Sequence, residues 1–294
     1  YLPGNCQVVV ASRTLPTKLT LTRLAGEGQV AGVGQEQLRF TPAEIRALVE
    51  HLHERRLSEM ESERLAQESE GWITALILGS DRMLDGVRID LARPSGDRRQ
   101  LFEYLAHEVL DAQSGPVRDF LVGSSVLDSL SPALCDAVLG RDDSAAMLRH
   151  LDENNLFVTP ISGEGTWYRY HQLFQEFLRA RLAAEDPARA AALDRRAAAW
   201  HAAAGRTDEE IRHLLAAGDF ADAAARMAAA VDAALAQGRW QTIIRWARAL
   251  PADAIQAHPR LLTMLATACS YDGDMADSIA AFASAAALYE AAGD

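Results

Sequence analysis

The sequence predicts a mainly α-helical protein of several domains that begins with the remnant of an α/β domain. Two capping boxes, Thr41-Pro42-Ala43-Glu44 and Ser58 with Glu61, mark the starts of helices. The chain after Pro187 is very rich in alanine and is predicted to be almost wholly helical. The apolar run Gln7–Arg13 is typical of a parallel strand covered on both faces, yet no βα unit precedes it in this sequence.

Composition and charge limit the classes of function. The chain has 294 residues, of which 49% are hydrophobic and 24% are charged, as in a soluble multi-domain protein. Its net charge of -12 opposes contact with a phosphate backbone, so we expect no direct nucleic acid contact. Cys6, Cys135 and Cys269 are far apart, which predicts reduced thiols and no metal site. With no signal peptide or membrane-spanning run, we expect a cytoplasmic protein without membrane contact.

The first two predicted domains are a remnant of an α/β domain at 1–40 and a helical linker domain at 41–100. A second short strand is predicted at Gln29–Val33 in the remnant. In the linker domain, helices follow the two capping boxes, and a third helix is predicted over Gly71–Leu84. The loop Arg88–Asp97 then marks a boundary.

The third predicted domain, at 101–185, is a winged helix. Helices joined by short connections lead to a β-hairpin at Thr159–Trp167, whose turn is Ser162-Gly163-Glu164-Gly165. Helices followed by a small β-wing are typical of this fold. The helix near Asp143–Asn155 would be the DNA-recognition helix of a DNA-binding relative, but its acidic residues argue against that use here.

The fourth predicted domain, at 186–294, is a helical arm followed by the start of tetratricopeptide-like repeats. Two segments echo each other, Ala217–Ala224 and Asp272–Ile279; each has Gly-Asp, then a large apolar residue, then a helix. Pro259 opens the helix before the second echo. Solenoids of this kind need several repeats, so we expect the chain to be a fragment of a longer protein.

The sequence contains no recognisable catalytic motif. Gly26-Glu27-Gly28-Gln29-Val30-Ala31 matches the dinucleotide fingerprint formally, but no helix is predicted to open at its end. The sequence has no Walker A motif, no His-x-x-x-His, no Cys-x-x-Cys and no nucleophile elbow. We therefore expect no catalytic and no metal residues, and only weak nucleotide binding by this chain alone.

The most unusual segment is Trp167–Leu178, in which aromatic residues and His171 precede a helical apolar stripe. A plain interpretation is a strand end that leads into a core helix, with His171 as a satisfied core histidine. Further motifs in order along the chain favour a second interpretation. The segments are Val8–Arg13 with Leu15-Pro16, Leu38–Thr41 with Glu44, Glu70–Leu76, Phe120–Leu127, Asn155–Phe157, Trp167–Leu178, Ala198–Trp200 and Leu250-Pro251.

Together these segments resemble the MalT-like family of large ATP-binding LuxR-type regulators, which are signal-transduction ATPases with numerous domains. The resemblance implies a switch in which ADP closes the molecule, while inducer and ATP open it for self-association and promoter activation. It implies that the remnant at 1–40 is the C-terminal part of a nucleotide-binding α/β domain. It also implies that Arg13 and His171 face the nucleotide phosphates and that the helix near Gly71 lies at the adenine. Ile73 stands where related ATPases have an adenine-packing proline.

The resemblance therefore implies ATP or ADP as the cofactor of the parent protein, a small-molecule inducer at the repeats, and self-association. The chain departs from the family pattern because it has neither Walker motif and no C-terminal helix-turn-helix. The alternative interpretation is a stand-alone helical repeat adaptor for protein partners with no nucleotide role. An enzyme with an unrecognised site ranks third. The coding sequence upstream of Tyr1 would separate the first two.

Overall fold

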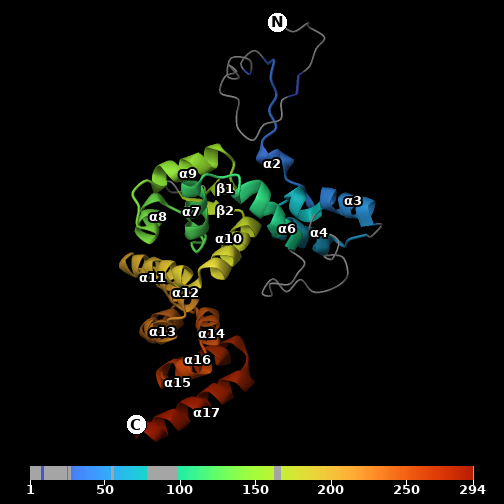
Figure 1. Cartoon of the computed structure of the whole chain (residues 1–294). Coiled ribbons are helices and arrows are strands. Elements are labelled where there is room, and N and C mark those ends of the chain that lie inside the picture. The colour runs from blue at the N-terminus through green and yellow to red at the C-terminus, as the bar shows by residue number, and fades with distance from the viewer. Residues whose placement is uncertain are drawn as a thin grey trace. The chain divides into compact units, whose positions relative to one another are not determined.

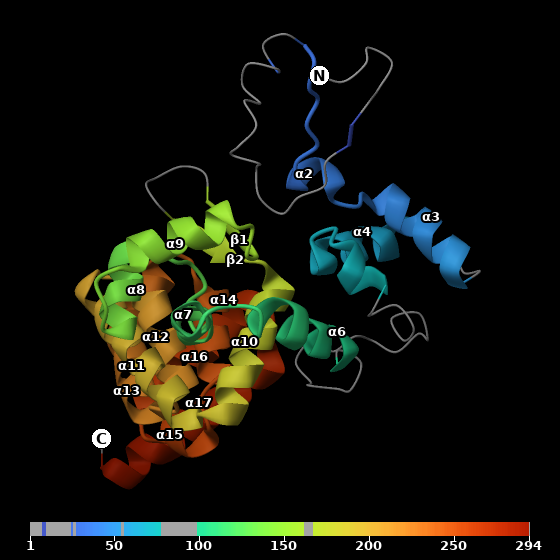
Figure 2. The ribbon, with the colours of Figure 1, turned by 45° about the horizontal axis from the view of Figure 1, so that its top comes forward.

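The computed structural model describes residues 8–9, 25, 28–53, 56–77, 99–161 and 167–293. The chain divides into two compact units, and each is described by itself. Unit 1 comprises Tyr1–Pro132 and Asp142–Arg181, and unit 2 comprises Ala133–Arg141 and Leu182–Asp294. Figures 1 and 2 show the helices and strands of both units. The finer division into four domains stays a prediction.

The linker region of unit 1 is a helical hairpin that begins at the two predicted capping boxes. After a short helix α2 (Gln35–Leu38), helices α3 (Pro42–His53) and α4 (Glu59–Ser69) lie side by side. Thr41 Oγ1 accepts a hydrogen bond from Glu44 N at 3.3 Å, and Ser58 Oγ accepts one from Glu61 N at 3.2 Å. In both boxes the glutamate accepts the backbone N–H of the capping residue in return. Both predicted helix starts are confirmed.

A small apolar core holds this hairpin together. Its buried members are Ile45 and Val49 of α3, Leu65 of α4, and the flanking residues Leu57 and Leu76. Leu76 belongs to the helical residues 73–77. This is the beginning of the helix predicted over Gly71–Leu84; its remaining part lies outside the described residues.

The predicted second strand at Gln29–Val33 is wrong. Residues 29–33 have no strand structure, and the side chains of Val30 and Val33 are exposed. β-Branched residues form a strand only where a neighbouring strand takes their backbone groups, and the described residues offer no such partner there. The predicted strand Gln7–Arg13 lies outside the described residues except for Val8 and Val9, which are exposed and are not in a strand.

The rest of unit 1 contains the helices and wing of the predicted winged helix. It begins with a short α-helix that continues into a π-helical turn. Two further helices, the β-hairpin and a long helix follow in chain order. The elements are α6 (Arg99–Tyr104), η2 (Leu105–Leu110), α7 (Gly115–Ser124), α9 (Ser144–Glu153), β1 (Val158–Pro160), β2 (Tyr168–Tyr170) and α10 (Gln172–Glu185).

The predicted β-hairpin is confirmed. Strands β1 and β2 are antiparallel, with Val158 opposite Tyr170 and Pro160 opposite Tyr168. Leu130 adds an isolated bridge on the other edge, because it exchanges backbone hydrogen bonds of 2.7 and 2.8 Å with Tyr168. The predicted turn, 162–165, lies outside the described residues.

Long polar side chains of α10 fix the connection that follows α7. Arg179 Nε donates to Ser125 O at 2.7 Å and its Nη2 donates to Val126 O at 2.9 Å. Gln175 Nε2 donates to Leu127 O at 2.6 Å. These carbonyls lie just beyond the end of a helix and need donors from elsewhere. A buried contact of 2.7 Å between Ser124 Oγ and the Tyr170 hydroxyl ties α7 to β2.

Unit 2 is an array of helices, as its alanine-rich sequence predicts. Arg196 of α11 donates to Val138 O at 3.1 Å, so the short helix α8 belongs to this unit. The helices are α8 (Pro132–Leu139), α11 (Pro187–Ala203), α12 (Thr207–Ala217), α13 (Phe220–Ala236), α14 (Trp240–Arg248), α15 (Ala252–Gln256), α16 (Pro259–Asp272) and α17 (Met275–Ala292).

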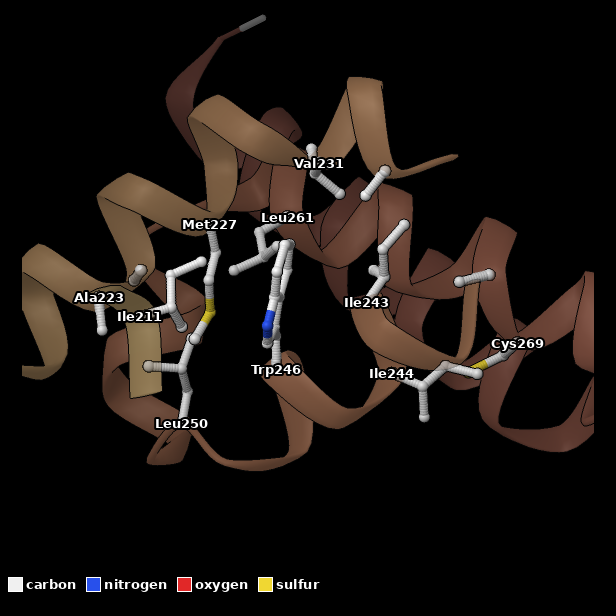
Figure 3. Close-up of a cluster of buried hydrophobic side chains, with 13 residues drawn as sticks. Ile211, Ala223, Met227, Val231, Ile243, Ile244, Trp246, Leu250, Leu261 and Cys269 are labelled. Atoms are coloured by element: carbon white, nitrogen blue, oxygen red, sulfur yellow. The ribbon is translucent and has the colours of Figure 1, made fainter. Parts of the chain in front are cut away.

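The core of unit 2 is apolar and is contributed by successive helices. Figure 3 shows the ring of Trp246 among Met227, Ile243 and Leu261, which come from α13, α14 and α16. Alanines at other core positions, such as Ala223, let the helix backbones approach closely.

The two echoing segments have the same local structure. Gly218 and Gly273 end α12 and α16 in the left-handed conformation, with φ of 78° and 89°. Asp219 and Asp274 then stand at the N-caps of α13 and α17. Each aspartate also accepts from an arginine of an earlier helix: Asp219 from Arg195 at 2.7 Å and Asp274 from Arg248 at 3.4 Å.

Among the described residues, no helix is long and apolar enough to cross a membrane. The same part of the chain contains no group of three or more His, Cys, Asp or Glu residues arranged to hold a metal ion.

Candidate functional site

The candidate site is the tight turn Ser69-Glu70-Gly71 at the end of α4, together with the corner between β2 and α10. Glu70 and Gly71 both have left-handed backbones, with φ of 47° and 70°. Gly71 N donates to Ala66 O at 3.2 Å and to Ser69 Oγ at 3.2 Å. Ser69 Oγ itself donates to Leu65 O at 2.7 Å. The turn is therefore held from within by its own backbone and by one buried hydroxyl.

Gly71 is required for two reasons. Its left-handed φ favours glycine, and Phe40 lies directly against it. A Cβ at position 71 would come within 2.8 Å of Phe40 O and 2.9 Å of Phe40 N. Phe40 N donates to Gly71 O at 2.9 Å, so the start of α3 and the turn are bonded together.

The carboxylate of Glu70 contacts the corner between β2 and α10 on two sides. Arg169 of β2 donates to it through Nη1 and Nη2, at 3.0 and 3.2 Å to the two oxygens. Gln172 N, the first N–H of α10, donates to Glu70 Oε1 at 3.1 Å. Bidentate pairing with arginine and capping of a helix N-terminus both favour the ionised carboxylate.

His171 lies between these two contacts and is 6% exposed. Its Nε2 lies 3.2 Å from Ser69 O, so Nε2 carries a proton and donates it to this carbonyl. Its backbone N donates to Phe157 O at 2.8 Å. The buried Nδ1 has no hydrogen-bond partner among the described residues.

Aromatic rings surround the histidine. The centroid of Trp72 lies 5.5 Å from that of His171 and 5.1 Å from that of Phe157, in edge-to-face arrangements. The ring of Tyr104 also lies near Trp72, with centroids 6.4 Å apart. Phe157 has a left-handed backbone, with φ of 57°, which a bulky residue adopts only where its surroundings hold it.

The surroundings shift the pKa of both ionisable groups. Burial lowers the pKa of His171 below its ordinary value, although the Glu70 carboxylate and the hydrogen bond to Ser69 act in the opposite direction. Burial would raise the pKa of Glu70, but the hydrogen bonds from Arg169 and Gln172 and the neighbouring positive charges lower it below its ordinary value. His171 is therefore neutral and Glu70 ionised near neutral pH.

The structure brings Gly71 and His171 together, because the turn that contains Gly71 supplies the Ser69 carbonyl to which His171 donates. Ile73 follows in the first turn of helical residues 73–77 and is half-buried. Arg13 lies outside the described residues. The nucleotide-facing roles of all four residues stay predictions. Sequence reasoning missed Glu70 and Arg169, although both stand inside the motif segments that contain Gly71 and His171.

The arrangement is suited to holding two parts of unit 1 in one geometry. Glu70 is paired with Arg169, and the N–H of Gly71 is already hydrogen-bonded within the turn. His171 Nδ1 has no hydrogen-bond partner in the part of the chain that the structure describes. Protonation at Nδ1 would turn the His171 ring into a donor on both nitrogens, which suits an anionic partner.

Comparison with known proteins shows a likeness to MalT regulators. The model of the MalT winged helix domain matches residues 106–190. The HTH-type transcriptional regulator MalT of Klebsiella pneumoniae (strain 342) is 33% identical over 223 residues, which is 74% of this chain and 25% of that protein. MalT of Yersinia pestis (strain Pestoides F) is 34% identical over the same shares. The match thus spans about a quarter of the length of these curated relatives.

A solved structure from Pyrococcus horikoshii, a signal transduction ATPase with numerous domains and a tetratricopeptide repeat sensor, aligns with 90% of this chain and 45% of that one. Its TM-score of 0.29 and identity of 14% are too low to carry an argument. Residues 106–190 match the MalT winged helix domain, and 74% of the chain is similar to MalT transcriptional regulators at 33–34% identity.

Proposed function

We propose that this chain supplies the switch region and the start of the sensor of a transcription regulator gated by ATP and ADP. The observation that carries the proposal is the 33–34% identity between this chain and MalT regulators over 74% of the chain. The match of residues 106–190 to the MalT winged helix domain supports it. In this proposal the relatives' role in transcription extends to this protein. We propose no enzymatic activity for this chain, because its relatives are named as transcriptional regulators.

The junction supports a role for His171 in sensing the nucleotide. A buried neutral imidazole with an unpaired Nδ1 becomes more basic when an anion approaches, because the anion favours the charged ring. Binding of a nucleotide phosphate beside His171 would therefore be coupled to protonation of its Nδ1. Arg13, on a different predicted domain, would face the same phosphates. Closure of the switch would then depend on the bound nucleotide.

Gly71 and Ile73 would act through shape. The N–H of Gly71 is already used by Ala66 O and Ser69 Oγ, so it is not a phosphate donor. The absence of a side chain at Gly71 brings the turn against Phe40, which sets where the following helical residues begin. Ile73 would then offer an apolar contact to adenine. A small-molecule inducer would act on the helical repeats of unit 2, and the active regulator would self-associate.

The test is calorimetric titration of the complete gene product with ADP. We expect His171→Ala to weaken ADP binding by about tenfold, which corresponds to roughly 1.4 kcal/mol for one charge-assisted hydrogen bond. His150→Ala is the matched control, because His150 is an exposed histidine on α9. A reporter gene should show higher inducer-free transcription for His171→Ala only. Equal ADP affinity of the two variants, or no ADP binding by the complete product, would overturn the nucleotide-sensing role.

A further inference from the structure

The turn Ser69-Glu70 is hydrogen-bonded to three residues of the β2–α10 corner: Arg169, His171 and Gln172. Glu70 pairs with Arg169 before His171 and with Gln172 N after it. Ser69 O accepts from His171 itself. All of these bonds are long-range, since the partners are separated by 99 to 102 positions in the sequence.

Glu70 serves as the N-cap acceptor for α10 in place of a local residue. The residue that precedes this helix is His171, which is not among the favoured N-cap types, and its ring is directed to Ser69. The first N–H of α10 instead meets a carboxylate from the end of α4. A negative group at this position also complements the dipole of a helix of 14 residues.

The pair is partly shielded from water, more than an exposed ion pair such as Arg248–Asp277 of unit 2. The side chain of Glu70 is 11% exposed and that of Arg169 is 43% exposed. By comparison, Arg248 and Asp277 are 59% and 55% exposed. Exposed pairs contribute little to stability, while a buried bidentate carboxylate fixes geometry. Removal of Glu70 would leave Arg169, Gln172 N and the His171 ring without their common neighbour.

We propose that Glu70 is a positioning residue that acts as a release latch between the helical linker and the winged helix. When the latch is closed, α10 is capped from outside and His171 is held on Ser69 O. When it opens, the start of α10 and the His171 ring are freed in one step. The carbonyl of Phe157, a residue with a left-handed backbone, accepts the His171 N–H. The inference rests on the proposed function only for what His171 meets after release.

The latch can be tested on this chain without nucleotide. We expect Glu70→Ala to speed hydrogen exchange of the Gln172 amide and the first turn of α10 by at least about tenfold, because the amide loses its acceptor. Glu70→Gln keeps an oxygen for Gln172 and loses the charge, so its exchange should be intermediate. In both variants the pKa of His171, followed by NMR of its ring protons, should fall because the carboxylate that raises it is gone.

Glu68→Ala is the matched control. Glu68 lies on the same helix and pairs locally with Arg64 at 2.7 Å. Exchange in α13 reports on unit 2 and should stay unchanged in all variants. Equal exchange at Gln172 in Glu70→Ala and Glu68→Ala, or an unchanged His171 titration, would overturn the latch. If Glu70→Ala does not fold, Glu70→Gln and Arg169→Lys carry the same comparison.

The two proposals fail separately. An intact latch in exchange and titration, combined with unchanged ADP affinity in the His171 variant, would remove the nucleotide role and leave the latch. If the Glu70 variants show no change in exchange or titration while His171→Ala weakens ADP binding tenfold, the latch is removed and the nucleotide role remains.

Discussion

At the scale of single residues, Gly71 has both a left-handed backbone and Phe40 packed against the position of a Cβ. We expect Gly71→Ala to destabilise unit 1 by more than the roughly 1–2 kcal/mol that a left-handed backbone costs a residue with a Cβ, because Phe40 must also move. Gly218→Ala is the control for backbone conformation alone, since its φ is 78° and nothing lies within 4 Å of its Cβ position. Urea unfolding of both variants measures the difference, and equal losses would contradict the predicted clash with Phe40.

A second prediction at this scale concerns His201 on α11. Burial lowers its pKa to about 4, and the nearby His213 acts in the same direction. His201 stacks on His213, with centroids 5.4 Å apart, and His213 Nδ1 lies 2.7 Å from Asp194 Oδ1. Because the ordinary pKa is 6.5, the unfolded chain binds the proton first. The neutral ring therefore contributes stability above about pH 6.5, and this contribution is lost as pH falls toward 4.

The measurement is the urea midpoint between pH 7 and pH 4.5. We expect the decline with acidification to be smaller in His201→Gln than in the unmodified chain. His150→Gln, on an exposed histidine, should leave the decline as it is. An equal slope for His201→Gln would show that the buried ring does not titrate with unfolding.

At the scale of elements, local signals were predictable and long-range ones were not. The capping boxes at Thr41 and Ser58 place their donors and acceptors within three residues, so the sequence alone shows them. The wing was predictable because its hairpin is also local. The strand expected at 29–33 failed because strand formation depends on a partner. The Glu70–Arg169 pair joins residues 99 positions apart, and no spacing rule reveals such a contact.

The repeated Gly-Asp element makes a prediction about α17. Asp274 caps this helix by accepting from Asp277 N at 3.2 Å, and it also pairs with Arg248. Asp274→Ala should cost about 1 kcal/mol, mostly through the lost cap, because the ion pair is exposed. Asp274→Asn keeps the capping oxygen and should cost only a few tenths of that. Thermal unfolding distinguishes the variants, and equal losses would assign the effect to the ion pair.

At the scale of the whole molecule, charge decides the expected behaviour toward DNA. The chain carries a net charge of -12, and α9 of the winged helix is preceded by Asp143 and ends at Glu153. We expect no retention of a short DNA duplex by this chain in fluorescence anisotropy, because the 41 acidic residues outnumber the 29 basic ones and repel the phosphates. Binding that weakens steeply with added salt would contradict the prediction.

The external cap of α10 also affects the order of folding. The acceptor for its first N–H comes from a residue 102 positions earlier, so the helix start cannot be completed by its own neighbourhood. Contacts of such sequence separation form late, because a long loop must close first. During synthesis the α3–α4 hairpin emerges before the wing and can serve as a template for it. Refolding that begins from the winged helix alone should therefore leave the first turn of α10 frayed until that hairpin docks.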